Sequence, residues 1–154
     1  MLDAPQFLQT TSQPTAVIRF TIPRSEIQHV MGPGFGELMS TLAAQGIAAM
    51  GPFFSHHFRM DPQTFDFELG VPVPSPVTPM GRVTNSALPS VKVARTIYRG
   101  GYEGLGAAWG EFLALLDGQG HKSGPSLWEC YRKGPESGPD SATWETELTR
   151  PLAE

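Results

Sequence analysis

The segments QGIAAMGPFF (residues 45–54) and QGHKSGPSLW (residues 119–128) share one pattern: Gln-Gly, a short spacer and then Gly-Pro. Each segment follows an apolar stretch with helical spacing and precedes a strand-like stretch. A pattern that recurs at a fixed distance indicates that one folding unit occurs twice in the chain. The two segments therefore predict a duplicated fold.

The duplication extends beyond these segments. A shift of 74 positions aligns Gly36 with Gly110 and Leu42 with Leu116, and a shift of 73 aligns the two Gly-Pro pairs. The first copy predicts a strand at 15–23, a helix within 34–46 with Gly46 as its left-handed C-terminal cap, and strands at 53–60 and 64–73. The second copy predicts the same order, with elements at 82–88, 91–99, 100–120, 126–133 and 141–152.

Two β-α-β-β units are thus expected at about 15–77 and 81–152, in a single domain spanning 15–154 that follows a flexible lead-in at 1–14. One such unit alone would expose apolar sheet surface and a sheet edge, which a second unit can cover. We predict an α+β fold, in which a curved and mostly antiparallel sheet carries two main helices. A ligand cleft is expected where the units meet.

Composition and charge exclude several classes of protein. The chain has 154 residues, a formal net charge of −4 and scattered Lys and Arg residues, so direct nucleic-acid binding is not expected. No apolar run approaches the roughly 20 residues that span a bilayer. The one cysteine, Cys130, fits a reducing compartment, and the N-terminus lacks the pattern of a signal peptide, so the predicted location is the cytoplasm.

Cofactor and metal sites are not predicted. His56 and His57 are adjacent on a predicted strand and would point to opposite faces, which does not suit a metal site. The stretch GGYEGLG at 100–106 lacks the lysine of a phosphate loop and the full dinucleotide fingerprint. Cys130 is expected to be a small buried residue.

With both copies located, the chain resembles the GyrI-like small-molecule-binding family, which includes the effector-binding domains of AraC-type and multidrug-responsive transcription activators. The segments that carry the resemblance are GFGELMSTLAAQGIAAMGPFF, FDFELGVPV, GRVTNSALPSVKVARTIYRGGYEGLGAAWGEFLALL, SLWECY and WETELTRPL. The resemblance implies an aromatic pocket for bulky and often cationic compounds, and a stand-alone domain is expected because no stretch outside the duplicated region is long enough for a helix-turn-helix head. It also implies an acid in the pocket, at the position of Glu147, and for hydrolytic members a tryptophan, matched by Trp128.

From the residues themselves, Glu147 could attract a cation or move a proton if an aromatic cleft desolvates it. The alternative is that Glu147 lies on the solvated side of an alternating strand. Alternation would also place Trp128 and Cys130 on one face of their strand and Glu129 and Tyr131 on the other. The full set of predicted ligand-binding residues is Glu147, Trp128, Tyr131, Tyr98, Tyr102, Phe54, Phe58 and Glu68.

Three functions follow as hypotheses. The first is a binding protein for hydrophobic compounds, including cationic and polyaromatic ones, that acts as a sensor or a sink. The second is a hydrolase that opens strained electrophilic rings, such as those of cyclopropane-bearing genotoxins, with Glu147 as acid and base and Trp128 beside it. The third is an adaptor that contacts another protein through a sheet edge. The sequence leaves the natural ligand and the oligomeric state open.

Overall fold

The computed structural model describes residues 2–60, 63–124, 126–134 and 138–153. The chain divides into two compact units. Unit 1 consists of residues 1–10 and 91–154, and unit 2 of residues 11–90. The single domain expected from the sequence stays a prediction.

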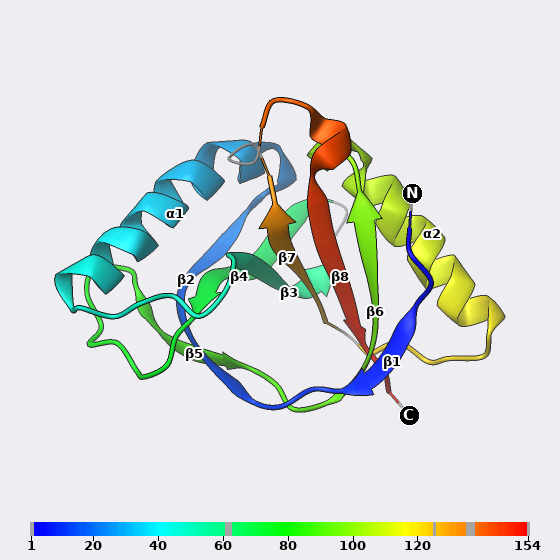
Figure 1. The fold of residues 1–154 in the computed structure, drawn as a ribbon, viewed down its shortest axis with the longest axis horizontal. Coiled ribbons are helices and arrows are strands. Elements are labelled where there is room, and N and C mark those ends of the chain that lie inside the picture. The colour runs from blue at the N-terminus through cyan, green and yellow to red at the C-terminus, as the bar shows by residue number, and fades with distance from the viewer. Residues whose placement is uncertain (1, 61–62, 125, 135–137, 154) are drawn as a thin grey trace. The chain divides into compact units, whose positions relative to one another are not determined.

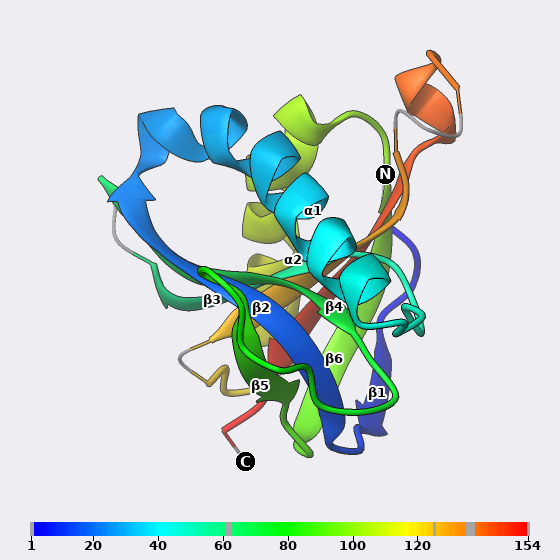
Figure 2. The ribbon, with the colours of Figure 1, turned by 90° about the vertical axis from the view of Figure 1, so that its left-hand side faces the viewer.

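Unit 2 is an antiparallel sheet with one helix on it. Its elements are β2 (Gln13–Pro23), a one-turn 3-10 helix (Arg24–Glu26), α1 (Ile27–Ala44), β3 (Phe54–Met60), β4 (Thr64–Pro72) and β5 (Thr84–Leu88). The strands pair in the order β3-β4-β2-β5. Helix α1 lies over β2 and β4 (Figure 2) and buries Leu38 and Leu42 against Ile18, Phe67 and Leu69.

Unit 1 repeats this arrangement. Its elements are β1 (Gln6–Gln9), β6 (Lys92–Arg99), a 3-10 helix (Tyr102–Gly104), α2 (Leu105–Gly118), β7 (Leu127–Lys133), a 3-10 helix (Ser141–Thr143) and β8 (Glu145–Pro151) (Figure 1). The strands pair in the order β1-β6-β8-β7, all antiparallel. Helix α2 buries Phe112 and Leu116 against Leu127 and Leu148.

The predicted α+β class is confirmed: each copy forms a β-α-β-β series with an antiparallel sheet and one main helix. Two details differ from the sequence expectation. Residues 1–14 are expected to form a loose lead-in, whereas the structure places β1 at Gln6–Gln9 and starts β2 at Gln13. The start of α1 differs as well.

No helix in the described part of the chain is both long and apolar enough to cross a membrane.

Helix α1 begins at Ile27, well before the predicted start at residue 34, and contains Pro33. Proline removes a helical hydrogen bond, but Pro33 is exposed, so water can reach the backbone at this turn. Ile27, Val30 and Met31 pack on the core and stabilise the first turns of the helix. The Gly-Pro-Gly sequence at 32–34 therefore lies inside the helix instead of preceding it.

The outer strands are exchanged between the two sequence copies. Strand β1 precedes the first copy but pairs with β6 of the second copy, with Gln6 opposite Arg95. Strand β5 precedes the β-α-β-β series of the second copy but pairs with β2 of the first, with Gln13 opposite Leu88. Each unit thus takes one strand from outside its own β-α-β-β series.

The duplication also reproduces irregular features. In β3 the register against β4 shifts just after His57, which lies opposite Phe67, and in β7 the register against β8 shifts just after Tyr131, which lies opposite Thr146. Bulges of this kind re-aim nearby side chains. The shared register makes His57 and Tyr131 equivalent positions.

The helices account for a change in the repeat offset. A 3-10 turn precedes each helix, and α1 has 18 residues where α2 has 14, which is about one extra turn. Arg24 therefore corresponds to Tyr102 before the helices at a shift of 78, whereas Gly46 corresponds to Gly120 after them at a shift of 74.

The repeated Gln-Gly ends both helices in the same way. Gly46 and Gly120 have φ of 67° and 81°, as the predicted left-handed cap requires. The amide of Ile47 donates to the carbonyl of Leu42, and the amide of His121 donates to that of Leu116. These are the bonds of a Schellman motif, which glycine favours because it has no Cβ.

Replacing Gly120 with alanine is expected to lower the free energy of unfolding by about 1 kcal/mol, because the alanine Cβ disfavours a positive φ. Gly110 provides the matched control: it lies inside α2, and a Cβ added there would meet no heavy atom within 4 Å beyond the backbone of its own helix. Gly110→Ala is expected to raise the free energy of unfolding by about 0.5–1 kcal/mol. Urea denaturation measures both changes, and equal signs for the two variants would contradict the assigned cap.

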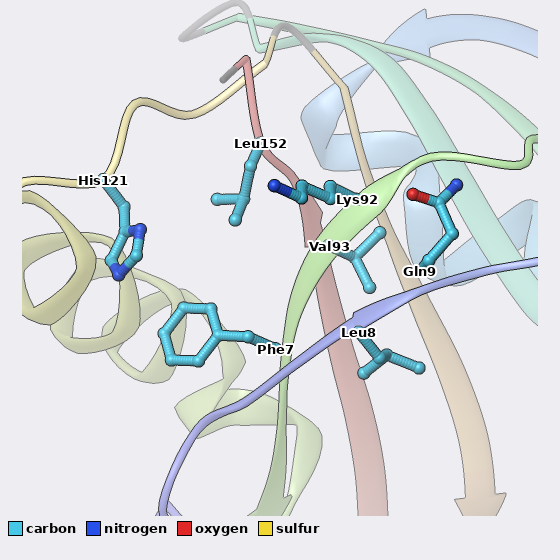
Figure 3. Close-up of a pocket in the computed structure, with 7 residues that line it drawn as sticks. All are labelled: Phe7, Leu8, Gln9, Lys92, Val93, His121 and Leu152. Atoms are coloured by element: carbon cyan, nitrogen blue, oxygen red, sulfur yellow. The ribbon is translucent and has the colours of Figure 1, made fainter.

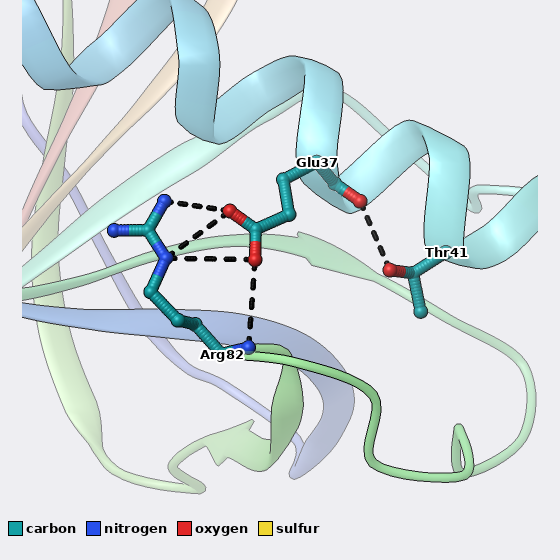
Figure 4. A network of polar contacts seen from close by, with 3 residues as sticks. All are labelled: Glu37, Thr41 and Arg82. Atoms are coloured by element: carbon teal, nitrogen blue, oxygen red, sulfur yellow. Dashed lines mark hydrogen bonds and ion pairs between the residues drawn. The ribbon is translucent and has the colours of Figure 1, made fainter.

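An ion pair connects α1 to the segment before β5. The Arg82 guanidinium donates to both carboxylate oxygens of Glu37, at 2.6 and 3.1 Å for the shortest contacts to Oε2 (Figure 4). This hydrogen bond lowers the pKa of Glu37. The Arg82 guanidinium also lies 5.2 Å from the centre of the Phe20 ring. It therefore contacts both a carboxylate and an aromatic ring.

Candidate functional site

A buried carboxylate, Glu129 on β7, lies at the centre of the candidate site in unit 1. Trp109 on α2 donates its indole N–H to Glu129 Oε1 at 2.6 Å, and the Tyr131 hydroxyl donates to Oε2 at 2.9 Å. Glu129 is only 9% exposed. Among the described residues, both of its hydrogen-bond partners are neutral, which is unusual because buried charges are ordinarily paired.

Aromatic rings extend from this carboxylate to the surface. The Tyr131 ring meets Tyr102 in a T-shaped contact at 5.8 Å, and Tyr102 in turn lies 5.1 Å from Trp144. Tyr102 is 38% exposed. We name Glu129, Trp109, Tyr131, Tyr102 and Trp144 the Glu129 cluster.

Local sequence explains how these groups come together. Leu127, Glu129 and Tyr131 share one face of β7, as alternation predicts, and the structure shows that α2 covers this face, where Leu127 joins the core. Tyr102 lies in the 3-10 turn that starts α2. Trp144 follows a second 3-10 turn, where its indole N–H donates to the carbonyl of Gly138.

Burial raises the pKa of Glu129, and the hydrogen bonds from Trp109 and Tyr131 oppose this only in part. Desolvation penalises the charged form of a carboxyl group, so the folded protein favours the protonated form of Glu129 more than water does. A cation close to Glu129 would reverse this preference. A positively charged group brought close to Glu129 would therefore favour its carboxylate form.

Glu147 and Trp128, the predicted acid and tryptophan, lie on the other face of the unit 1 sheet. Glu147 is opposite Cys130 in the β7–β8 register, out of phase with Glu129. Its side chain is 20% exposed and lies 3.4 Å from Arg95 Nε. Trp128 is 2% exposed. The role of Glu147 as the pocket acid stays a prediction.

The three predicted tyrosines lie on the α2 side of unit 1. Tyr131 and Tyr102 belong to the Glu129 cluster. Tyr98 packs against the core under α2 and donates its hydroxyl to the carbonyl of Gly101 at 2.9 Å. Tyr98 thus holds the turn that carries Tyr102.

The other predicted residues lie in unit 2. Phe54 on β3 is 1% exposed and opposite Gly70. Phe58 lies under the guanidinium of Arg19, 4.6 Å from the ring centre. Glu68 accepts a hydrogen bond from Ser86 Oγ at 2.8 Å. That these side chains share a pocket with those of unit 1 stays a prediction.

The two histidines point to opposite faces of β3, as predicted. His56 contacts the Phe58 ring at 4.3 Å, whereas His57 stacks on Phe67 at 5.0 Å. Cys130 is half-buried, and burial raises the pKa of its thiol to about 12, with Glu147 contributing. A thiol of that pKa is protonated at neutral pH and is a poor nucleophile.

Unit 1 also has a shallow depression of about 350 Å³ at the end of α2 (Figure 3). The Phe7 ring stacks on His121 there at 4.6 Å. The lining residues are Phe7, Leu8, Gln9, Lys92, Val93, His121 and Leu152. None of them belongs to the predicted site or to the Glu129 cluster.

Residues 3–153 match the family described as GyrI-like small molecule binding domain. The chain belongs to the GyrI-like family. No curated protein sequence matches it. The EcmrR C-terminal domain has a similar structure, with a TM-score of 0.85, 20% identity and 98% of each chain covered. EcmrR in the cryo-EM structure of its DNA complex is also similar, with a TM-score of 0.84 and 19% identity over 97% of this chain. This chain spans only 57% of that EcmrR chain.

Two further solved structures share the GyrI-like fold. A hydrolase from Listeria innocua has a TM-score of 0.68 and 10% identity, covering 97% of this chain and 91% of its own. SAV2435, solved with bound tetraphenylphosphonium, has a TM-score of 0.66 and 15% identity, covering 97% of this chain and 94% of its own. At these identities the likeness establishes the fold alone.

Sequence reasoning did not select the central acid of this GyrI-like domain. Alternation along β7 places Glu129 on the same face as Leu127 and Tyr131. An acid on the same strand face as a core leucine is the sequence feature that could have pointed to Glu129. Helical spacing favours a core position for Trp109, and it is indeed 7% exposed. Its indole N–H nevertheless contacts the acid.

Proposed function

We propose that this GyrI-like domain binds hydrophobic aromatic cations at the Glu129 cluster, and acts as a sensor or a sink for them. The observation that carries the proposal is a buried carboxylate with neutral partners, Trp109 and Tyr131, at the inner end of a series of aromatic rings. A cation that reaches Glu129 would stabilise its charged form. The ligand's charge then supplies the pairing that the buried carboxylate lacks.

The aromatic rings suit the rest of such a ligand. Tyr102, Tyr131 and Trp144 can present π faces to a positive charge or stack on planar groups, at about 0.5–2 kcal/mol per good contact. Tyr102 is exposed, so the outer end of the cluster lies at the surface. Family membership supports a small molecule as ligand, and tetraphenylphosphonium bound to SAV2435 supports a lipophilic cation.

Glu147 keeps the role of a second acid within the proposal. Its carboxylate is already beside Arg95, which also donates to Thr149 Oγ1 at 3.2 Å. A cationic ligand at Glu147 would have to compete with this guanidinium. Glu129, which has no charged hydrogen-bond partner among the described residues, is the stronger candidate.

Calorimetric titration with tetraphenylphosphonium tests the proposal. We expect saturable binding of the cation and at least tenfold weaker binding of triphenylphosphine oxide, which has similar rings but no net charge. Equal affinities for the two compounds, or no heat with either, would contradict a site selective for cations.

Hydrolysis of a strained electrophilic ring is the second candidate, favoured by the raised pKa of Glu129 and by the Listeria innocua hydrolase of the same fold. In that reaction water forms a C–O bond to one ring carbon as a ring C–C bond breaks, and the other carbon takes up a proton. Either Glu129 beside Tyr131 on one face of the sheet, or Glu147 on the face of Trp128, would relay the proton. Mass spectrometry with protein far below the compound's concentration tests it: a water adduct in excess of protein supports catalysis, and unchanged compound excludes turnover of that substrate.

A role as sensor would require a second component that contacts DNA or another protein. EcmrR is described in complex with DNA, and this chain spans 57% of that EcmrR chain. Direct contact of this chain with nucleic acid is not proposed, because its basic residues are scattered and its net charge is −4. The cytoplasmic location stays a prediction from the sequence.

A further inference from the structure

The depression at the end of α2 is a cavity that the Glu129 cluster does not use (Figure 3). Its volume of about 350 Å³ is at the lower end of the roughly 300–1,000 Å³ typical of small-molecule pockets. All of its lining residues belong to unit 1. The register between β1 and β6 places Phe7 opposite Ala94 and Leu8 opposite Val93. The depression therefore lies between strand β1 and the segment that follows α2, which contributes His121.

Most of the lining is apolar. It includes Phe7, Leu8, Val93 and Leu152, and Leu152 also packs against the core under α2. Phe7 is 47% exposed, which is unusual for a phenylalanine, and its ring stacks on His121 at 4.6 Å. Figure 3 shows the side chains of His121 and Leu152 directed toward the Phe7 ring. An exposed ring beside aliphatic side chains suits a planar apolar ligand.

Lys92 is the one lysine, arginine or acidic residue among the lining residues. Its side chain is exposed and takes part in no hydrogen bond or ion pair within the described part of the chain. The acid nearest to His121 in the sequence, Asp117, is exposed and does not line the depression. The lining thus combines an unpaired positive charge with an apolar surface.

Arg150 adds a second uncompensated positive charge on the same face of the sheet. It lies opposite Ala94, two positions after Lys92, so Lys92 and Arg150 are diagonal neighbours with backbones about 7–8 Å apart. Arg150 is half-buried, and its Nε and Nη1 atoms have no hydrogen-bond partner among the described residues. Burial lowers the pKa of Arg150. An anion held nearby would stabilise its charged form.

We propose that this depression is a second small-molecule site, which binds aromatic monocarboxylates of one or two rings. The ligand carboxylate pairs with the Lys92 ammonium, and Arg150 adds to the positive potential there. The ligand ring covers Phe7 and Leu152 and removes their exposed apolar surface from water. The site goes beyond the proposed function, because anion binding here does not require that the Glu129 cluster binds cations.

Calorimetric titration with 2-naphthoate tests the charge of the site. We expect saturable binding that Lys92→Gln weakens about fivefold, as loss of an ion pair near the surface allows. The uncharged 2-naphthalenemethanol should bind the wild-type protein and this variant alike. Lys122→Gln is the matched control, because Lys122 is exposed and follows His121 but does not line the depression. That variant should change the naphthoate affinity less than twofold.

Phe7→Leu tests the aromatic class of the ligand. Leucine keeps an apolar side chain at this position and removes the ring, so naphthoate should bind about threefold or more weakly. Octanoate has the same charged group on an aliphatic chain, and it should bind the wild-type protein more weakly than naphthoate does. Tighter binding of octanoate, or an unchanged naphthoate affinity in Phe7→Leu, would overturn the assignment to aromatic ligands.

Two further measurements locate the site. Naphthoate should shift the methyl NMR signals of Leu152 but not those of Leu115, which is exposed on α2 and does not line the depression. Saturating tetraphenylphosphonium should leave the naphthoate affinity within twofold. Absence of naphthoate binding, equal losses in the Lys92 and Lys122 variants, unchanged Leu152 signals, or displacement by tetraphenylphosphonium would each overturn the proposal. Failure of tetraphenylphosphonium to bind would count against the proposed function alone.

Discussion

Glu129→Gln is expected to weaken tetraphenylphosphonium binding by roughly 30-fold or more, because truncating one partner of a buried charge pair costs about 2–5 kcal/mol. Glutamine keeps the size of the side chain and can still accept from Trp109 Nε1 while its amide faces the Tyr131 oxygen. The change therefore removes the charge and leaves the shape. Calorimetric titration of the variant measures the loss.

The pH dependence should change with it. The folded-state pKa of Glu129 is raised, so wild-type affinity for the cation should fall as pH drops through that pKa, and the variant's affinity should be flat there. Unfolding does not explain such a loss: an acid with a raised folded pKa destabilises the protein at higher pH, so Glu129→Gln should be at least as stable at pH 7. Glu147→Gln is the matched control, and an equal loss in both variants would contradict the assignment of Glu129.

Acid destabilisation is the second large effect. Burial lowers the pKa of both His56 and His57 to about 4, from 6.5. Their contribution to stability is complete above pH 6.5 and is lost as pH falls toward 4, because the unfolded chain takes up protons first. Between pH 7 and pH 5 the pair should lower the free energy of unfolding by about 3–4 kcal/mol.

Urea denaturation across this range measures the effect. The double variant His56→Phe/His57→Phe should lose most of the slope, and the control His29→Gln, at an exposed position, should keep it. Glu37 and Glu145 have lowered pKa values and lose their contribution only below about pH 4.5, so they do not account for a slope above pH 5. A wild-type slope in the double variant would rule out the histidines as its source.

The fold was largely predictable because the residues that end its helices and form its turns act locally. Gly46 and Gly120 mark helix ends by their backbone conformation alone, and the Gln-Gly and Gly-Pro pairs repeat at nearly constant distance. Strand β1 was not predictable, because QFLQ gains its structure from long-range pairing with β6 and has little strand pattern of its own. The first turns of α1 were not predictable either, because Pro33 disfavours a helix in the local sequence and tertiary packing is what stabilises these turns.

The site was predictable only in part, because alternation gives the two faces of a strand without saying which face the helix covers. Both Leu127 and Trp128 are 2% exposed, so apolar character marks neither side of β7 as the interior. Glu129 and Glu147 differ by their tertiary neighbours, an indole N–H for one and Arg95 for the other. Those neighbours come from α2 and β6, far away in the sequence.

The exchanged strand β1 has a consequence for biosynthesis. Residues 11–90 leave the ribosome as a complete unit, whereas β1, which is made before that unit, must wait for β6. Thr10 and Val91, which exchange hydrogen bonds next to this pair, are 81 positions apart, and closing so long a loop is slow. Unit 2 should therefore fold before unit 1 in nascent chains, and QFLQ should stay in solvent until β6 has been made.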